Sequence, residues 1–352
     1  MSPDAVFTIT YWGVTGTLTA PPRPAEVTDK LVAAVRCLVE GGRWGDLRPG
    51  PDLEADVRRA LERDLPFHLR TSYGGNTTCV EVQTPDELLI FDCGSGFREL
   101  GIDLEARWRA EGAGARRSAH VLVTHPHMDH TYGTPYFAPY YNPANAFTIW
   151  APRSVLDSMA VVLDPQSAHS RLFFPPTYDQ MTALKECRAV EAGADFRLGS
   201  TRVTTYALHH PGGCQAYRLE NAGRVFVFAT DHEQQEVPDP GLAAFARGAD
   251  LLYTEGQYTW AEYEGRAGVA GDPPLSRRGW GHSPVEACVA TAVAAGVRAL
   301  HVGHRDPRRS DAQIAQVDDY VRELMREELR RVGRPADSCR ALIPYEGLRV
   351  YL

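Results

Sequence analysis

The stretch THPHMDH, residues 124–130, places three histidines and one aspartate directly after a strand-like run. A strand that ends in such a loop can bring several of these side chains to one point. Histidine nitrogen and carboxylate oxygen together suit borderline metals such as zinc, manganese or iron. The order HxHxDH favours two metals, since His125 and His127 can point the same way while Asp129 and His130 continue the turn. A histidine-rich surface loop that binds nothing is the simpler alternative, and the density of the cluster argues against it.

Composition restricts the class of protein. Of the 352 residues, 43% are hydrophobic and 23% charged, so the chain can bury a substantial core. The formal net charge of -8 opposes broad capture of a nucleic-acid backbone, which disfavours a nucleic-acid polymer as substrate. No stretch approaches the ~20 apolar residues of a membrane helix. Seven scattered cysteines without CxxC spacing indicate reduced thiols, so we expect a cytoplasmic protein without membrane contact.

Residues 21–70 differ from the rest of the chain. A Pro-rich entry is followed by two predicted helices, 26–40 and 53–64, on either side of a Gly/Pro break. The apolar positions of the first helix follow helical spacing: Leu31, Val35, Leu38 and Val39. This favours a surface elaboration or a dimer contact over a catalytic role, and a homodimer remains open. We therefore predict a single domain over residues 1–352 with a helical insertion at about 21–70.

Other predicted strands also end in ligand-type residues. The run 88–91 ends in Asp92, which could be a ligand, a partner that orients a ligand histidine, or a turn cap. Strand 201–208 is followed by His209 and His210, strand 224–229 by Asp231, and strand 297–302 by His304. Asp231 is a plausible carboxylate bridge between two cations. This recurrence carries more weight than any one motif.

A short strand, 250–253, leads to Glu255, and His282 stands just before a predicted helix. We expect Ser283 to cap that helix, Pro284 to occupy its first position and Glu286 to complete a capping box. From the residues alone, His282 fits a packing or capping histidine better than a catalytic one.

Together these strand ends resemble the metallo-β-lactamase superfamily of binuclear metallohydrolases, whose signature is HxHxDH with later His, Asp and His ligands. The resemblance implies an α/β protein with a four-layer αββα sandwich. It implies that His125, His127 and His210 hold one metal, that Asp129, His130 and His304 hold the other, and that Asp231 bridges them. The implied cofactors are two divalent transition metals, with Zn²⁺ favoured over Mn²⁺ or Fe.

Within the superfamily the chain looks like the phosphodiesterase branch, which includes ribonuclease Z and the phosphoribosyl cyclic phosphate phosphodiesterases. The motifs that carry this resemblance are WGV at 12–14, YGGNT at 73–77, DCGSG at 92–96, HPGG at 210–213, GHS at 281–283 and DP at 306–307. Two departures matter: Ser283-Pro284 replaces the usual Ser-Thr, and the Gly/Pro-rich basic arm that grips tRNA has no obvious counterpart. The missing arm, together with the acidic net charge, moves the expectation from tRNA toward a small phosphodiester.

The resemblance implies a hydrolase that attacks a cyclic nucleotide or cyclic phosphate with a metal-bridging hydroxide. Asp129 and Asp231 would hold the hydroxide, with Asp129 accepting a proton, while His282 protonates the leaving alkoxide and Glu255 orients His282. The alternatives are a metal-dependent lactonase, thioesterase or β-lactamase, a non-catalytic metal-binding scaffold, and, least favoured, a mononuclear iron oxidoreductase. The neighbouring histidines are expected to point to the other faces of their strands: His209, His232 and His301.

Overall fold

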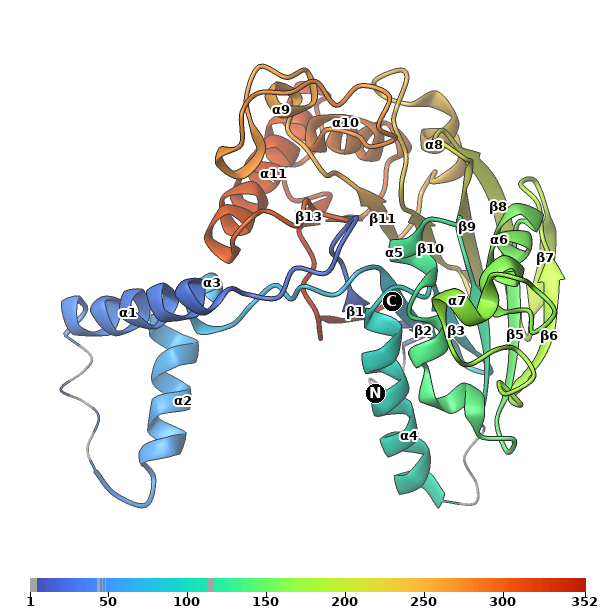
Figure 1. Cartoon of the computed structure of the whole chain (residues 1–352). Coiled ribbons are helices and arrows are strands. Elements are labelled where there is room, and N and C mark those ends of the chain that lie inside the picture. The colour runs from blue at the N-terminus through green and yellow to red at the C-terminus, as the bar shows by residue number, and fades with distance from the viewer. Residues whose placement is uncertain (1–4, 43–44, 46, 48, 113–116) are drawn as a thin grey trace.

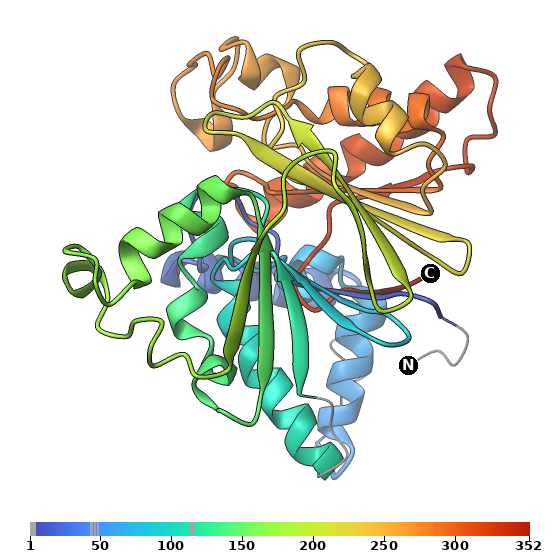
Figure 2. The same ribbon diagram turned by 90° about the vertical axis from the view of Figure 1, so that its right-hand side faces the viewer.

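The computed structural model describes residues 5–42, 45, 47, 49–112 and 117–352, and its strands form two stacked sheets (Figures 1 and 2). The first sheet runs in the order β14 (Arg349–Tyr351), β1 (Thr8–Gly13), β2 (Cys79–Gln83), β3 (Leu88–Phe91), β4 (Ser118–Leu122), β5 (Ala146–Ala151) and β6 (Leu184–Ala189). The second runs in the order β13 (Arg340–Leu342), β12 (Ala299–Gly303), β11 (Leu251–Glu255), β10 (Arg224–Ala229), β9 (Cys214–Asn221), β8 (Thr201–Leu208) and β7 (Asp195–Leu198).

Both sheets are mixed. Strands β3 to β6 are parallel to one another, as are β10 to β13, while β1, β2, β8 and β9 pair antiparallel with their neighbours. The carboxyl ends of parallel strands meet at one edge of a sheet, where α/β proteins commonly place their sites. The edge at which β3, β4, β10, β11 and β12 end is therefore the place to look for function.

Alternating side chains bury both faces of the central strands. Leu89 and Phe91 of β3 belong to the core between the sheets, together with Phe226 and Phe228 of β10. The intervening Ile90 packs instead against the helices on the outer face of the first sheet. Strands that bury both faces read as continuous apolar runs, which explains why these strands were predicted from the sequence.

Helices cover the outer face of each sheet. The first sheet packs against α4 (Gly96–Glu111) and α6 (Arg153–Leu163), and the second packs against α8 (Pro240–Phe245), α10 (Val285–Ala295) and α11 (Asp311–Arg331). The predicted four-layer αββα sandwich is confirmed. No helix in the described part of the chain is both long and apolar enough to span a membrane.

The predicted helical insertion forms a separate arm beside the sandwich (Figure 1). It consists of α1 (Pro24–Glu40), α2 (Leu53–Asp64) and α3 (Phe67–Arg70), around a small core that includes Leu38. Of the apolar face expected on α1, Leu38 is buried in this core, whereas Leu31 is 63% and Val39 54% exposed. The exposure shows that helical spacing of apolar residues alone did not identify a buried face in this arm.

The predicted N-terminus of α10 differs in detail from the structure. The helix begins at Val285, with Pro284 rather than Ser283 in the capping position. Glu286 does not complete a capping box, because its carboxylate accepts the backbone N–H of Trp260 at 3.0 Å. At the other end, Gly296 stops the helix with a left-handed φ of 68°.

Candidate metal centre

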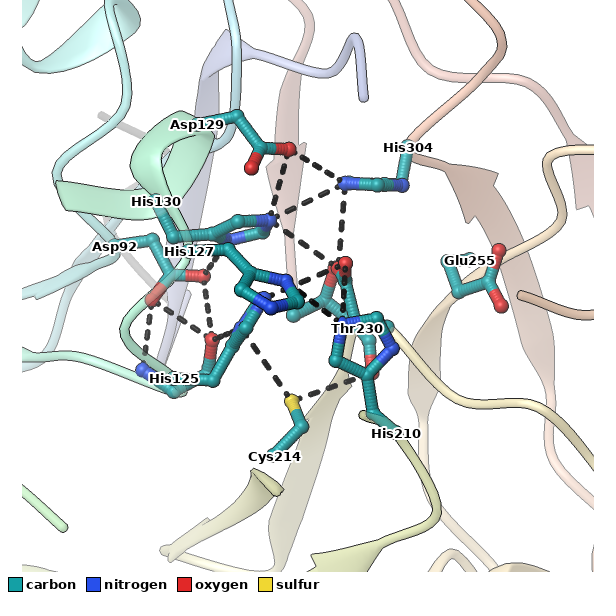
Figure 3. Close-up of polar contacts among 12 residues, drawn as sticks. Asp92, His125, His127, Asp129, His130, His210, Cys214, Thr230, Glu255 and His304 are labelled. Carbon is teal, nitrogen blue, oxygen red and sulfur yellow. Dashed lines mark hydrogen bonds and ion pairs between the residues drawn. The ribbon is translucent and has the colours of Figure 1, made fainter. Parts of the chain in front are cut away.

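The first sheet contributes one half of a cluster of histidines and aspartates (Figure 3). Strand β4 ends before Thr124, and the chain then turns through His125 and His127 into the short helix α5 (Met128–Thr131). This single turn of helix carries Asp129 and His130, and both side chains are buried. The predicted loop is therefore partly helical, which directs the side chains of Asp129 and His130 toward the second sheet.

The second sheet contributes the other half, from the ends of β8, β10 and β12. These strands lead to His210, Asp231 and His304, and each of the three side chains is buried. Asp231 has a φ of 28°, His304 a φ of 50°, and Asp92 at the end of β3 a φ of 60°. Positive φ is uncommon outside glycine, and such backbone strain concentrates at functional sites.

The side chains with candidate ligand atoms form two adjacent groups and a third set, Asp231, His282 and His304, that overlaps both. The first group is His125, His127, His210 and Asp231, and the second is Asp129, His130 and His304. Within each group the candidate ligand atoms lie within 4.8 Å of one another. All seven residues that the family resemblance implies as metal ligands thus meet at one place.

Asp231 connects the two groups through its two carboxylate oxygens. Oδ2 lies 3.6 Å from Nε2 of His125 and 3.7 Å from Nε2 of His210. Oδ1 lies 3.3 Å from Nε2 of His130 and 3.3 Å from Nε2 of His304. Each oxygen therefore faces a different pair of histidines, which is the arrangement a bridging carboxylate requires.

Asp129 is held from two sides. Its Oδ2 accepts the backbone N–H of Thr17 at 2.7 Å and lies 3.1 Å from Nε2 of His304. Burial opposes ionisation of this carboxyl group, but His130 and His304 outweigh it and hold the pKa of Asp129 well below its usual range. Asp129 is thus a carboxylate at neutral pH, the form that coordinates a cation.

Asp92 orients a candidate ligand and does not belong to either group. Its Oδ2 lies 2.8 Å from Nδ1 of His130, and its Oδ1 accepts the backbone N–H of Thr124 at 2.8 Å. A carboxylate on Nδ1 leaves Nε2 of the same ring free to bind a metal. Of the three interpretations left open by the sequence, the structure supports the orienting partner.

A backbone carbonyl orients His210 in the same way. Nδ1 of His210 lies 2.8 Å from the carbonyl oxygen of Gly281, whose φ is 90°. A Cβ at position 281 would approach Nδ1 of His210 to 2.2 Å, so the contact requires glycine. The buried Glu233 accepts the backbone N–H groups of Gly279 at 2.7 Å and Gly281 at 2.8 Å. The sequence interpretation missed Glu233, because its role depends on a loop distant in the chain.

The donor set fits two divalent cations. Nε2 of His125 is buried without a hydrogen-bond partner among the described residues. Nδ1 of His127 lies 3.0 Å from Nε2 of His210, and Nε2 of His130 lies 3.2 Å from Nε2 of His304. Imidazole nitrogens that face each other this closely need a shared proton or cation. Mixed histidine and carboxylate donors suit zinc and its neighbours among the transition metals.

His282 lies beside the cluster. Its ring stacks on that of His304, with 5.0 Å between centroids, and its Nδ1 lies 4.0 Å from Oδ2 of Asp231. The expected contact with Glu255 is long, at 3.7 Å from Nδ1 to Oε2, and is not a hydrogen bond. Glu255 instead accepts the backbone N–H of Ser283 at 2.6 Å. It therefore fixes the backbone beside His282 rather than the imidazole.

The neighbouring histidines take no part in either group. His232 bonds Asp239 at 3.0 Å, and His301 bonds the hydroxyl of Tyr11 at 2.7 Å. His209 is exposed. These positions agree with the expectation that the three side chains point away from the cluster.

Two sheets between helical layers, with histidines and aspartates gathered at the strand ends, define a metallo-β-lactamase-type protein. Residues 88–304 match the family profile described as the beta-lactamase superfamily domain, and the chain belongs to this family. The predicted superfamily, and with it the class of metal-dependent hydrolases, is confirmed.

Three individual proteins that resemble this chain share at most about a quarter of its residues in the matched regions. The chain is 24% identical over 301 residues to a ribonuclease Z from Synechococcus sp. (strain CC9311), covering 71% of this chain and 88% of the relative. It resembles the crystal structure of unliganded yeast PDE1 with a TM-score of 0.60 at 14% identity, covering 99% and 100% of the two chains. Zn²⁺-bound PqqB from Methylobacterium extorquens gives a TM-score of 0.57 at 15% identity, covering 98% and 100%. At these identities the two structures establish the fold alone.

Proposed function

We propose that this protein is a binuclear metal-dependent phosphodiesterase that acts on a small substrate of the cyclic nucleotide or cyclic phosphate type. The observation that carries the proposal is the position of Asp231, which presents one oxygen to each pair of histidines while His282 lies beside it. Two divalent cations, when bound, would neutralise the phosphate and acidify a water at neutral pH. The donor set favours Zn²⁺, which is also the metal in the PqqB structure.

The protein groups have distinct roles in this proposal. The seven residues of the two groups would hold the cations. Asp129, whose Oδ2 is fixed by Thr17, would orient the attacking water, and its low pKa makes it a better ligand than proton acceptor. Burial lowers the pKa of His282 to about 3, so His282 would donate a proton to the departing alkoxide only after the anionic substrate raises that pKa. Glu255 would keep His282 in place through the backbone of Ser283.

The charge on the arm favours a small substrate. Helices α1 and α2 carry seven acidic and five basic side chains. Arg58 and Arg63 are paired with carboxylates of the arm itself, at 2.7 Å in each case. A surface that grips RNA needs clustered, unpaired basic side chains, because phosphate contacts supply most of the affinity. These two helices do not provide such a surface.

A second candidate is endonucleolytic cleavage of a tRNA precursor, which the similarity to the ribonuclease Z of Synechococcus favours. It shares the metal centre and His282 with the first proposal, so the two candidates differ only in substrate. A third class is hydrolysis of lactones or thioesters; the thiolate that leaves a thioester needs no proton, so thioester hydrolysis would give His282 no role as an acid.

One experiment separates these candidates. The purified protein is analysed for metal and then assayed, reconstituted with Zn²⁺ or Mn²⁺, against bis(p-nitrophenyl) phosphate, 2′,3′- and 3′,5′-cyclic nucleotides, a tRNA precursor with a 3′ trailer, and a lactone. We expect close to two equivalents of metal and turnover of the small phosphodiesters, with Asp231→Asn as the inactive control. Metal-loaded protein that cleaves the precursor and none of the small phosphodiesters would replace the first candidate by the second. Turnover of the lactone alone would exclude both.

A further inference from the structure

A cavity lies between the arm and the sandwich, outside the candidate metal centre. Its volume is about 510 Å³, within the range of about 300 to 1,000 Å³ typical of small-molecule pockets. Helices α1 and α3 line one side of it, and the segment after His304 and the start of α11 line the other. Its apolar wall includes Ala33, Leu69, Pro307 and Ile314.

Two polar side chains that line this cavity have buried atoms without a partner. They are Oγ1 of Thr15 and Nη1 of Arg305, and neither has a hydrogen bond within the described part of the protein. Thr15 is 1% and Arg305 4% exposed. The other terminal nitrogen of Arg305 donates to the carbonyl oxygen of Gly74. Buried polar groups are nearly always paired, so two such atoms at one cavity indicate that something else supplies the acceptor.

The other charged groups around the cavity are satisfied or exposed. Asp311 accepts Nζ of Lys30 at 2.5 Å and the backbone N–H of Tyr73 at 2.9 Å. Asp306 accepts Nε of Arg308 at 2.8 Å. Arg309 is paired with Glu262 at 2.6 Å, Glu26 accepts the backbone N–H of Arg23 at 2.8 Å, and Asp29 is exposed. Glu346 and Asp311 lie near enough to favour the charged form of Arg305, but neither carboxylate accepts a hydrogen bond from its Nη1, so this nitrogen lacks an acceptor within the described part of the protein.

The cavity is separated from the metal centre by a single segment of chain. Thr15 lines the cavity, whereas Thr17, two residues later, donates its N–H to Asp129. Gly16 lies between them and is packed so closely that a Cβ there would approach the ring of His304 to 2.5 Å. A ligand in the cavity would thus contact one side of a wall whose other side faces the candidate metal ligands.

We propose that this cavity is a binding site for a small organic anion with an apolar body, whose carboxylate, sulfonate or phosphate group is held by Arg305 and Thr15. The apolar wall accommodates the body of the ligand, and the two unpartnered donors receive its charged end. This proposal does not rest on the proposed phosphodiesterase activity, since it requires neither the metals nor His282.

The test uses isothermal titration of the metal-loaded protein with benzenesulfonate, which combines an apolar ring with one anionic group and is a poor metal ligand. Benzyltrimethylammonium, similar in size and opposite in charge, is the matched probe. We expect one benzenesulfonate to bind, the cation not to bind, and Thr15→Val to weaken binding about tenfold. Arg305→Met should abolish it. Chelation of the metals should leave the affinity unchanged, because the cavity contains none of the candidate ligands.

Thr78→Val is the matched control. The hydroxyl of Thr78 is also buried without a partner, yet Thr78 does not line the cavity, so the variant should bind benzenesulfonate as the unaltered protein does. Thr15→Val should unfold at the same urea concentration as the unaltered protein, since its hydroxyl has no protein partner to lose. Equal binding by the cation, equal weakening by both valine variants, loss of binding on chelation, or a crystal of the soaked protein with only water on Thr15 and Arg305 would each overturn the proposal.

Discussion

Asp92 and His130 form a fully buried pair, with 2.8 Å between Oδ2 of the carboxylate and Nδ1 of the ring. The carboxylate fixes the tautomer in which Nε2 carries a lone pair, and Nε2 is the atom that faces Asp129 and Asp231. Asp92 therefore controls a candidate ligand without joining the ligand set.

We expect Asp92→Asn to weaken metal binding about 10- to 100-fold, because the amide can donate to Nδ1 and force a proton onto Nε2. Competition with a chromophoric chelator measures the change. The control is Asp239→Asn, which alters a similar pair, 3.0 Å from His232, outside the cluster. Equal metal affinity in the two variants would show that Asp92 does not orient a ligand.

The role of His282 can be tested through the leaving group. His282→Ala should lower turnover of a substrate with an alkyl leaving group about 10²- to 10⁴-fold, while a nitrophenyl ester, whose leaving group needs no proton, should lose much less. Metal content should stay at the level of the unaltered protein. His209→Ala is the control, since His209 is an exposed neighbour of His210. Loss of metal from His282→Ala would make His282 a ligand, as its distance to Asp231 allows.

Glu233 holds the backbone of Gly279 and Gly281, so its replacement should lower both the stability of the fold and the affinity for metal. Glu233→Gln replaces one acceptor oxygen by an N–H donor, so the N–H of Gly279 or Gly281 loses its partner at a cost of about 1 to 3 kcal/mol. The carbonyl of Gly281 then moves away from His210, and metal affinity falls. Urea unfolding and chelator competition measure the two effects. Glu264→Gln, at a partly exposed surface carboxylate, should change stability by less than about 0.5 kcal/mol.

His301 predicts part of the acid sensitivity of the fold. Burial, aided by Arg322, lowers the pKa of His301 from 6.5 to about 3. Between these pH values the unfolded chain binds a proton that the folded chain does not, so stability falls as the pH falls below 6.5. The slope from this group approaches about 1.4 kcal/mol per pH unit. His301→Asn, whose amide still accepts from Tyr11, should flatten the profile of urea midpoints between pH 7 and 5. An unchanged profile would contradict this assignment.

The sequence predicted central strands such as β3 and β10 because they bury two apolar faces, and it indicated the candidate ligand residues because these follow predicted strands. The edge strand β6 was missed. Most side chains of β6 are exposed, so its sequence, LKECRA, has no apolar periodicity, and its strand conformation depends on pairing with β5. Such pairing is set by tertiary contacts rather than by local pattern.

Hydrogen bonds between loops that are distant in the chain could not be predicted from the sequence either. The expected cap at Glu286 failed because Trp260 competes for the same carboxylate. The expected bond from Glu255 to His282 was replaced by one to the backbone of Ser283. In each case the glutamate was expected to accept a hydrogen bond, but its actual partner lies in a segment that only the folded chain brings close.

The left-handed backbone at Asp92, Asp231 and His304 has a consequence for selection experiments. A non-glycine residue in such a conformation costs on the order of 1 kcal/mol or more, so glycine would relax the turn that now holds His304. His304→Gly would also remove a buried ring that stacks on His130 and His282, and the resulting cavity costs more than the relaxed turn gains, so the variant should fall in a library sorted by cellular abundance as well as in one sorted by turnover.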